Sequence, residues 1–190
     1  MCPNALGARN WPATALNPMT HTLYIPIAET CANYTYSPRS AAETAAGGSD
    51  IRTGRASKPG TDGLYGRIAA VDLTTRKVIW TKRQREPFAS AILSTGGGLI
   101  FSGSRDRMFR ALDERTGAVL WETRLNASPS SFPVTYSVDG QQYVAVVAGG
   151  GGPLDASGLA NAPEVDNPSE GITLSVFKMP GRAAARPRRR

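Results

Sequence analysis

Few side chains in this sequence are of the types that bind metals or act as nucleophiles. The chain has two cysteines, Cys2 and Cys31, and a single histidine, His21. Two thiols and one imidazole are fewer than the four ligands of a structural zinc site. A disulfide between cysteines 29 positions apart would instead indicate an oxidising compartment. From the spacing alone, two unpaired buried cysteines remain an alternative.

The carboxylates give no acid–base pair that the sequence can identify. Asp106, Asp113 and Glu114 lie in segments with the composition of tight turns, where such side chains bond the turn backbone or face solvent. These three acids are therefore expected to be structural or solvated.

The positive charge is concentrated at the C-terminus. The net charge is +7, and residues 182–190 carry five arginines and no acid. Without them the body of the chain has a charge of about +2, which is ordinary for a folded domain. Because no aromatic residue interleaves the arginines, a disordered basic tail over 179–190 is favoured over an RNA-binding arm. No nucleic-acid partner is expected.

The elements that must position any site are predicted to be short strands. The chain has 20 Gly and 14 Pro and shows little helical periodicity, a combination that favours an all-β fold. Strands are predicted at 23–27, 66–71, 78–82, 91–93, 99–102, 108–112, 119–123, 134–137, 143–148 and 172–177. Residues 39–63 and 149–170 are expected to form long loops. No basic–apolar leader precedes them, and no run reaches the ~18 apolar residues of a membrane span.

A repeat runs through the middle of the chain. The pattern Ala-x-Asp-x-x-Thr-x-x-x-x-Trp ends at Trp80 and again at Trp121, an offset of 41 residues. Repeats of this length made of short strands are typical of β-propeller blades. In the first copy Arg76 stands where Gly117 stands in the second. A fainter half-copy covers residues 14–24, and the Asp-Gly pair within 138–142 predicts a hairpin turn.

Three further stretches, together with this repeat, resemble the late blades of the pyrroloquinoline-quinone (PQQ) dependent alcohol and glucose dehydrogenases. They are Cys2-Pro3 followed by Gly-Ala-Arg-Asn-Trp-Pro-Ala-Thr-Ala-Leu-Asn-Pro at 7–18, Leu-Ser-Thr-Gly-Gly-Gly-Leu-Ile-Phe-Ser-Gly at 93–103, and Pro-Val-Thr-Tyr with Gly-Gln-Gln-Tyr-Val-Ala-Val over 133–146. The repeat itself is similar to the family's tryptophan-docking motif. The likeness covers roughly residues 2–178.

The resemblance implies a fold and an activity. The family forms an eight-bladed propeller of four-stranded antiparallel sheets, with PQQ and a calcium ion near the axis. It oxidises an alcohol or a sugar and passes electrons to a cytochrome or a quinone, in the periplasm. At about 40 residues a blade, this chain is expected to supply roughly three to four C-terminal blades and to need the remaining blades as partners.

The resemblance also implies roles for individual residues. Asn10 matches an asparagine that hydrogen-bonds PQQ. An amide suits this role because it can both donate and accept hydrogen bonds. Trp11 adjoins it. Without the family match, a turn role would be preferred for Asn10. Cys2 and Cys31 match a family disulfide, and Trp80 and Trp121 match residues that lock adjacent blades.

One departure affects the expected cofactor site. Some alcohol dehydrogenases of this family carry Trp-Gly-Gly along the PQQ site, where this chain has Phe88, with Ala89 in the place of the tryptophan. Either Phe88 covers the cofactor in part or the site is more open here, so the resemblance does not fix specificity for an alcohol. The alternative is that Phe88 is a core residue. In the family the calcium ligands and the general base belong to earlier blades, and no stretch of this chain matches them. We therefore assign no catalytic acid, no catalytic base and no metal ligand in this chain.

Two hypotheses from different classes follow. The chain is part of a PQQ-dependent dehydrogenase and inactive by itself, or it is a non-catalytic repeat scaffold like that of outer-membrane assembly lipoproteins. Asn10 and Trp11 together with the paired cysteines favour the enzyme, because a scaffold does not require a cofactor-facing amide.

Overall fold

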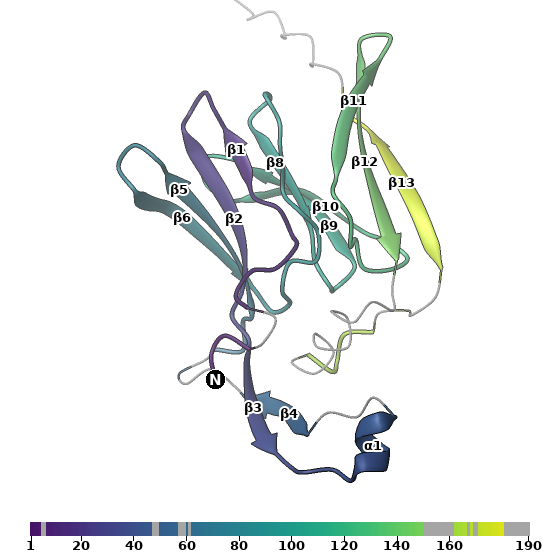
Figure 1. The fold of residues 1–190 in the computed structure, drawn as a ribbon. Coiled ribbons are helices and arrows are strands. Elements are labelled where there is room, and N and C mark those ends of the chain that lie inside the picture. The colour runs from purple at the N-terminus through teal and green to yellow at the C-terminus, as the bar shows by residue number, and fades with distance from the viewer. Residues whose placement is uncertain are drawn as a thin grey trace, which may run out of the picture.

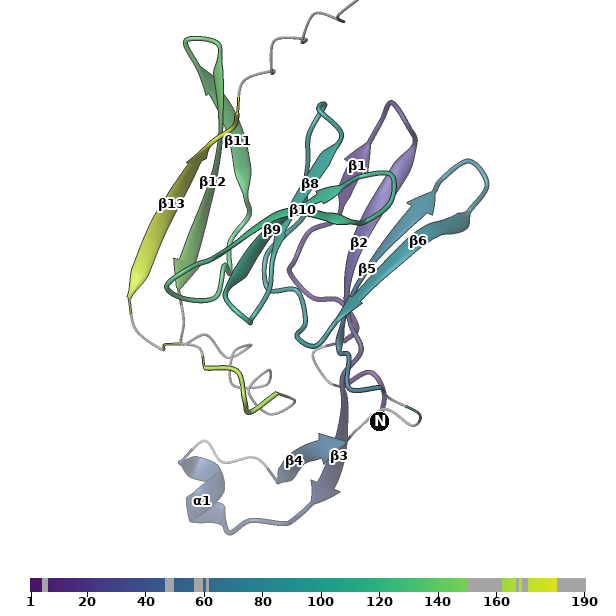
Figure 2. The ribbon, with the colours of Figure 1, turned by 180° about the vertical axis from the view of Figure 1, so that it is seen from behind.

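The computed structural model describes residues 1–4, 7–46, 50–56, 60, 62–149, 162–166, 168 and 171–180. Three antiparallel sheets stand side by side in these residues like the blades of a propeller (Figure 1). Their inner strands lie close together, and the sheets diverge from there. Figure 2 shows the same arrangement from behind. The predicted all-β fold, an arc of a propeller, is confirmed.

Each blade is a meander of neighbouring strands. The first contains β1 (Ala15–Asn17), β2 (Thr22–Ala28), β5 (Gly66–Asp72) and β6 (Lys77–Gln84), in that order. The second contains β7 (Leu93–Ser94), β8 (Leu99–Gly103), β9 (Met108–Asp113) and β10 (Val119–Arg124), also in chain order. The third contains β11 (Val134–Val138), β12 (Gln141–Gly149) and β13 (Ile172–Lys178). The described residues therefore form two blades of four strands and one of three.

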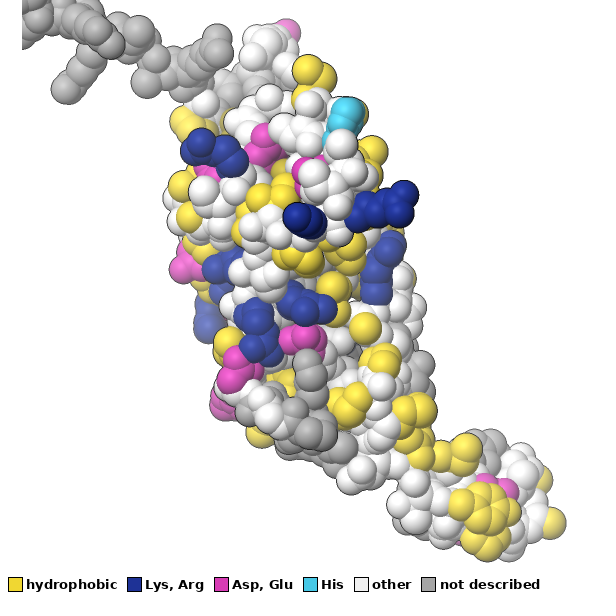
Figure 3. All heavy atoms as spheres, turned by 90° about the vertical axis from the view of Figure 1, so that its left-hand side faces the viewer, with side chains coloured by type: hydrophobic (Ala, Val, Ile, Leu, Met, Phe, Trp, Pro, Cys, Tyr) yellow, Lys and Arg dark blue, Asp and Glu magenta, His cyan; other side chains and the backbone are white. Residues whose placement is uncertain are grey.

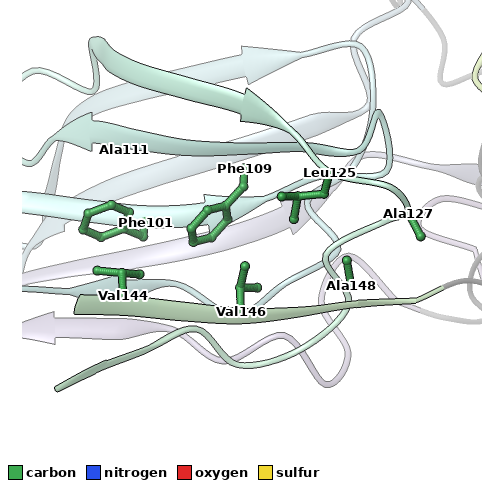
Figure 4. Close-up of a cluster of buried hydrophobic side chains, with 8 residues drawn as sticks. All are labelled: Phe101, Phe109, Ala111, Leu125, Ala127, Val144, Val146 and Ala148. Atoms are coloured by element: carbon green, nitrogen blue, oxygen red, sulfur yellow. The ribbon is translucent and has the colours of Figure 1, made fainter. Parts of the chain in front are cut away.

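The hydrophobic core lies between the blades rather than inside any one of them. Tyr24 and Ile68 of the first blade pack against Ile100 and Leu112 of the second. Between the second and third blades, Phe101 and Phe109 face Val144 and Val146 (Figure 4). Because a single sheet cannot bury its own two faces, the blades stabilise one another by stacking.

The turns of the repeat have the geometry that its residue types predict. Asp72 and Asp113 each accept hydrogen bonds from the backbone N–H groups two and three residues later. The residue four positions later has positive φ, 60° at Arg76 and 71° at Gly117. Asn17 accepts the same two bonds in the half-copy. Short-range bonds from an Asp or Asn side chain are therefore sufficient to close all three turns.

The segment predicted as a loop over 39–63 has regular structure in part, so that prediction was wrong there. It holds α1 (Ala41–Ala45) and β4 (Ile51–Ala56), and β4 pairs with β3 (Cys31–Tyr36). Ser40 and Glu43 form a reciprocal capping box that starts the helix. Figures 1 and 2 show this arm projecting away from the three blades.

The other expectations have different outcomes. The strand predicted at 91–93 is limited to Leu93–Ser94, because the N–H groups of Ala91 and Ile92 bond neighbouring segments instead of a strand partner. The hairpin at Asp139-Gly140 is present, with positive φ at both residues. Most of the predicted loop 149–170 and residues 181–190 of the predicted tail lie outside the described residues.

Candidate cofactor-binding face

Three chain segments converge where the innermost strands of the blades begin. Residues 10–14 lead into β1, residues 88–92 lead into β7, and residues 130–133 lead into β11. The N–H of Ile92 donates to the carbonyl of Ala13 at 3.1 Å, and that of Ala91 donates to the carbonyl of Ser131 at 3.2 Å. The segment of the second blade therefore joins the other two.

Trp11 and Phe132 meet at this convergence. Their ring centroids are 5.8 Å apart with an interplanar angle of 48°. They belong to the first and third blades, which the second blade separates, so a direct contact is possible only where the blades converge on the propeller axis. Asn10, exposed and next to Trp11, lies on the same side. Phe132 was not identified by the sequence reasoning.

Phe88 and Ala89 belong to the convergent segment but are both only 7% exposed. The Phe88 side chain packs in the core between the first and second blades, with Tyr24 and Ile100. The N–H of Ala89 donates to the carbonyl of Gly103 at 2.9 Å. Phe88 thus has the core position that was one of its two expected placements, and cofactor contact by either residue stays a prediction.

A buried and a half-buried hydroxyl group hold these segments in place. The buried Ser90 Oγ donates to the carbonyl of Ala91 at 2.8 Å and accepts from the N–H of Gly103 at 2.7 Å. The half-buried Ser131 Oγ accepts from the N–H of Val147 at 2.9 Å. Sequence reasoning missed both serines, because a serine in a loop carries no signal of the backbone groups that its hydroxyl bonds.

Glu86 is an unusual buried acid on the same side of the blades. It is 2% exposed, and its Oε1 has no hydrogen-bond partner among the residues that the structure describes. Loss of solvation raises the pKa of this carboxyl to about 7, although Arg105 and Arg85 oppose the rise. Glu164 and Asp106 add to it through like charge. Nothing in the sequence indicated that Glu86 is buried, beyond its place directly before Pro87 and Phe88.

The N-terminal residues are fixed beside this face by a disulfide. Cys2 and Cys31 are bonded, with their Cα atoms 4.5 Å apart. The terminal amine of Met1 also donates to the carbonyl of Ala32 at 2.8 Å. Farther along, the N–H of Ala28 donates to the carbonyl of Ala8 at 2.7 Å. Together these bonds tie the segment before Asn10 to β3 of the projecting arm and, at Ala28, to the first blade.

Trp80 connects the first blade to the second. Its Nε1 donates to the backbone carbonyl of Glu114 at 2.9 Å. Its ring covers Gly117 so closely that a Cβ there would lie 2.7 Å from Cε3 of the indole. Trp121 has different surroundings, because it is 40% exposed and meets Phe109 and Phe177 edge-on. Both keep their docking role as a prediction, and the contact of Trp80 is its clearest support.

The acidic residues considered above are engaged in other contacts. Asp106 is paired with Arg110, and Glu114 accepts from the amide of Asn17 at 2.7 Å. In the part of the chain that the structure describes, no three His, Cys, Asp or Glu side chains lie close enough together to hold a metal ion. Nor does any described helix have the length and apolar character needed to cross a bilayer.

The face therefore fits one side of a flat, polar cofactor such as PQQ. It offers aromatic surface at Trp11 and Phe132 and a donor–acceptor amide at Asn10. It does not offer a cluster of carboxylates for an accompanying metal among the described residues.

Comparison with known proteins identifies relatives of this chain. Quinoprotein alcohol dehydrogenase PedH of Pseudomonas putida is 30% identical over 180 residues, which are 95% of this chain and 30% of that protein. The lanthanide-dependent methanol dehydrogenase of Methylacidiphilum fumariolicum is 32% identical over 178 residues, covering 90% of this chain and 28% of the relative. The crystal structure of quinohemoprotein alcohol dehydrogenase from Comamonas testosteroni matches with a TM-score of 0.74 at 27% identity, covering 96% of this chain and 28% of that one.

This chain thus spans less than a third of the length of each of these relatives. A family model described as "PQQ: Glucose/ethanol/alcohol dehydrogenase, beta-propeller domain" matches residues 1–144. The chain belongs to the family of PQQ-dependent glucose, ethanol and alcohol dehydrogenase β-propeller domains.

Proposed function

We propose that this chain forms part of the propeller of a PQQ-dependent dehydrogenase and supplies one wall of its cofactor site. The observation that supports the proposal is the contact of Trp11, in the segment leading into the first blade, with Phe132, in the segment leading into the third; Asn10 directly precedes Trp11 in the chain. PQQ, when bound, accepts the two electrons that an alcohol or sugar loses on oxidation, and a cytochrome or quinone then receives them.

The roles of the residues follow from their chemistry. The amide of Asn10 can donate to a quinone or carboxylate oxygen and accept from a ring N–H, so it orients a cofactor that carries both groups. Trp11 presents a rigid aromatic surface against which a planar cofactor packs. The disulfide and the bonds from Ala28 and Ile92 hold this segment still, which limits the entropy lost on binding.

The remaining blades are the expected partners of the chain. Both outer faces of the arc expose large apolar side chains, such as Ile79 on the first blade and Leu174 and Val176 on the third. Figure 3 shows hydrophobic and basic side chains side by side over the first blade. Val176 pairs with Ala145, and both residues lie on the face of the sheet that is opposite to the buried Val144. Such faces are typical of interfaces, and a further blade would bury them as the second blade buries its neighbours.

The metal and the compartment belong to the same proposal. A calcium or a lanthanide ion is expected beside PQQ, with its ligands supplied by the other blades. The disulfide between Cys2 and Cys31 supports a periplasmic location, because such bonds persist in oxidising compartments.

A chimera tests the proposal. The segment of a quinoprotein alcohol dehydrogenase that this chain matches would be replaced by residues 1–180, and PQQ retained after gel filtration would be measured by absorbance. We expect the chimera to retain PQQ and to reduce a dye with an alcohol. The full chain with PQQ and Ca²⁺ or La³⁺ should do neither, since most of the site lies elsewhere.

Variants of the chimera locate the contact. Asn10→Ala should reduce the retained PQQ, whereas Asn33→Ala, on β3 of the projecting arm, should leave it unchanged. A folded chimera that retains no PQQ would contradict the proposal and favour the scaffold hypothesis. Turnover by the unassisted chain would show that its dependence on other blades is wrong.

A further inference from the structure

The turn that joins β5 to β6, residues 72–77, has the same backbone form as the turn that joins β9 to β10, residues 113–118. In each, the aspartate that begins the turn accepts from the N–H groups two and three residues later. The N–H groups of Arg76 and Gly117 donate to the carbonyl of that aspartate, at 2.7 Å and 2.9 Å. Both residues have positive φ. Arg76 of this first-blade turn therefore occupies the position that Gly117 has in the second-blade turn.

Trp80 of the first blade docks on the second-blade turn in close contact. Its Nε1 donates to the carbonyl of Glu114 at 2.9 Å. A Cβ at Gly117 would lie 2.7 Å from Cε3 and 2.8 Å from Cζ3 of the indole. Carbon atoms attract best at about 3.5–4.0 Å, so one of the two groups would have to move. The indole has this position because residue 117 carries no side chain.

The first-blade turn cannot receive an indole in the same way. Arg76 has a Cβ where Gly117 has none, and a tryptophan placed as Trp80 is would overlap with it. The charge also differs, because Arg76 and Lys77, both exposed, stand where the second turn has Gly117 and Ala118. Residues 72–77 thus contain one carboxylate and two cations, whereas residues 113–118 contain two carboxylates and one cation.

The two cations of the first-blade turn are not neutralised within the fold. The Asp72 carboxylate accepts from the N–H groups of Thr74 and Thr75. Neither Arg76 nor Lys77 forms an ion pair with another residue that the structure describes. A surface of this charge is complementary to an acidic partner.

We propose that the blade which precedes the first one contacts the first-blade turn with a carboxylate in place of a docking tryptophan. The inference rests on the proposed function, because it takes a further blade as the neighbour of the first. It gives this junction of the propeller a charged contact, in contrast to the indole contact that joins the first blade to the second.

The premise is tested in the full chain by placing an arginine at Gly117. Gly117→Arg should lower the urea concentration at the unfolding midpoint more than Gly140→Arg does. Both glycines have positive φ, but a Cβ at Gly140 would meet no atom within 4 Å. Equal losses would mean that a side chain fits beneath the indole, and the inference would fail.

The chemistry of the partner is tested in the chimera that carries residues 1–180. In the host blade directly before the junction, the residue equivalent to Trp80 is set to tryptophan or to glutamate. Each host is combined with the unchanged chain and with Arg76→Gly, and the thermal unfolding midpoints are compared by circular dichroism without PQQ. The effect of the substitution on the turn itself is common to both hosts and cancels in this comparison.

With Arg76 we expect the glutamate host to have the higher midpoint, and with Arg76→Gly the tryptophan host. In 1 M NaCl, where the Debye length is about 3 Å, the advantage of glutamate should shrink. Arg115→Gly, which removes an exposed arginine from the second-blade turn, is the matched control and should leave the order of the hosts unchanged. The same order with Arg76 and with Arg76→Gly, or equal midpoints throughout, would overturn the inference. Failure of the proposed function would appear separately, as a folded chimera that retains no PQQ.

Discussion

Glu86 is expected to make the stability of this chain depend on pH, and Glu86→Gln should remove that dependence. The carboxyl is 2% exposed and its pKa is raised from 4.5 to about 7. Below pH 4.5 the group is protonated in both the folded and the unfolded chain, so burial of a charge costs nothing there. As the pH rises toward 7, the unfolded chain releases the proton before the folded chain does, and the free energy of unfolding falls.

The magnitude follows from the same shift. At 1.36 kcal/mol per pKa unit, a rise of about 2.5 units corresponds to roughly 3 kcal/mol of lost stability above pH 7. Glutamine has nearly the same shape and no charge, so Glu86→Gln should be more stable than the unchanged chain by about 2–3 kcal/mol at pH 8. At pH 4 the two should be equal.

Urea unfolding followed by tryptophan fluorescence at pH 4, 6 and 8 measures the difference. Glu122→Gln is the matched control, because it removes an acid whose ion pair with Arg110 is exposed on the glutamate side. Such a pair contributes about 0–1 kcal/mol. A Glu86→Gln chain no more stable than the unchanged chain at pH 8, or equally stabilised at pH 4 and pH 8, would refute the reasoning.

Two other predictions concern the contacts between and beside the blades. Gly117→Ala should lower the free energy of unfolding by about 1–3 kcal/mol more than Gly140→Ala, because both glycines have positive φ but only a Cβ at Gly117 meets the ring of Trp80. Equal losses in urea titrations of the two variants would contradict that. Replacing Cys2 and Cys31 together by serine should cost about 2–4 kcal/mol. The unchanged chain treated with a reductant should then unfold at the same urea concentration as the variant, and a variant as stable as the oxidised chain would show that the disulfide does not stabilise the fold.

The local backbone of this protein was determined largely by the sequence. The turn after Asp113 and the hairpin at Asp139 could be predicted because side-chain and backbone groups a few residues apart fix them. Arg76 adopts positive φ in place of glycine, and its turn is closed by the two side-chain bonds of Asp72 together with the bond from the N–H of Arg76 to the carbonyl of Asp72. The arm of β3, β4 and α1 was missed because its two strands pair across an intervening helix, a long-range pairing that local residue preferences do not indicate.

The candidate site was determined only by the tertiary structure. Sequence comparison with the family singled out Asn10 and Trp11, but the contact of Trp11 with Phe132 depends on the angle at which three blades stack. The core position of Phe88 and the burial of Glu86 depend on the same stacking. Short-range preferences decide how the strands within each blade are connected by turns. Burial is decided by which blades share an interface. Residues more than a hundred positions apart, such as Trp11 and Phe132, meet only when all three blades are assembled.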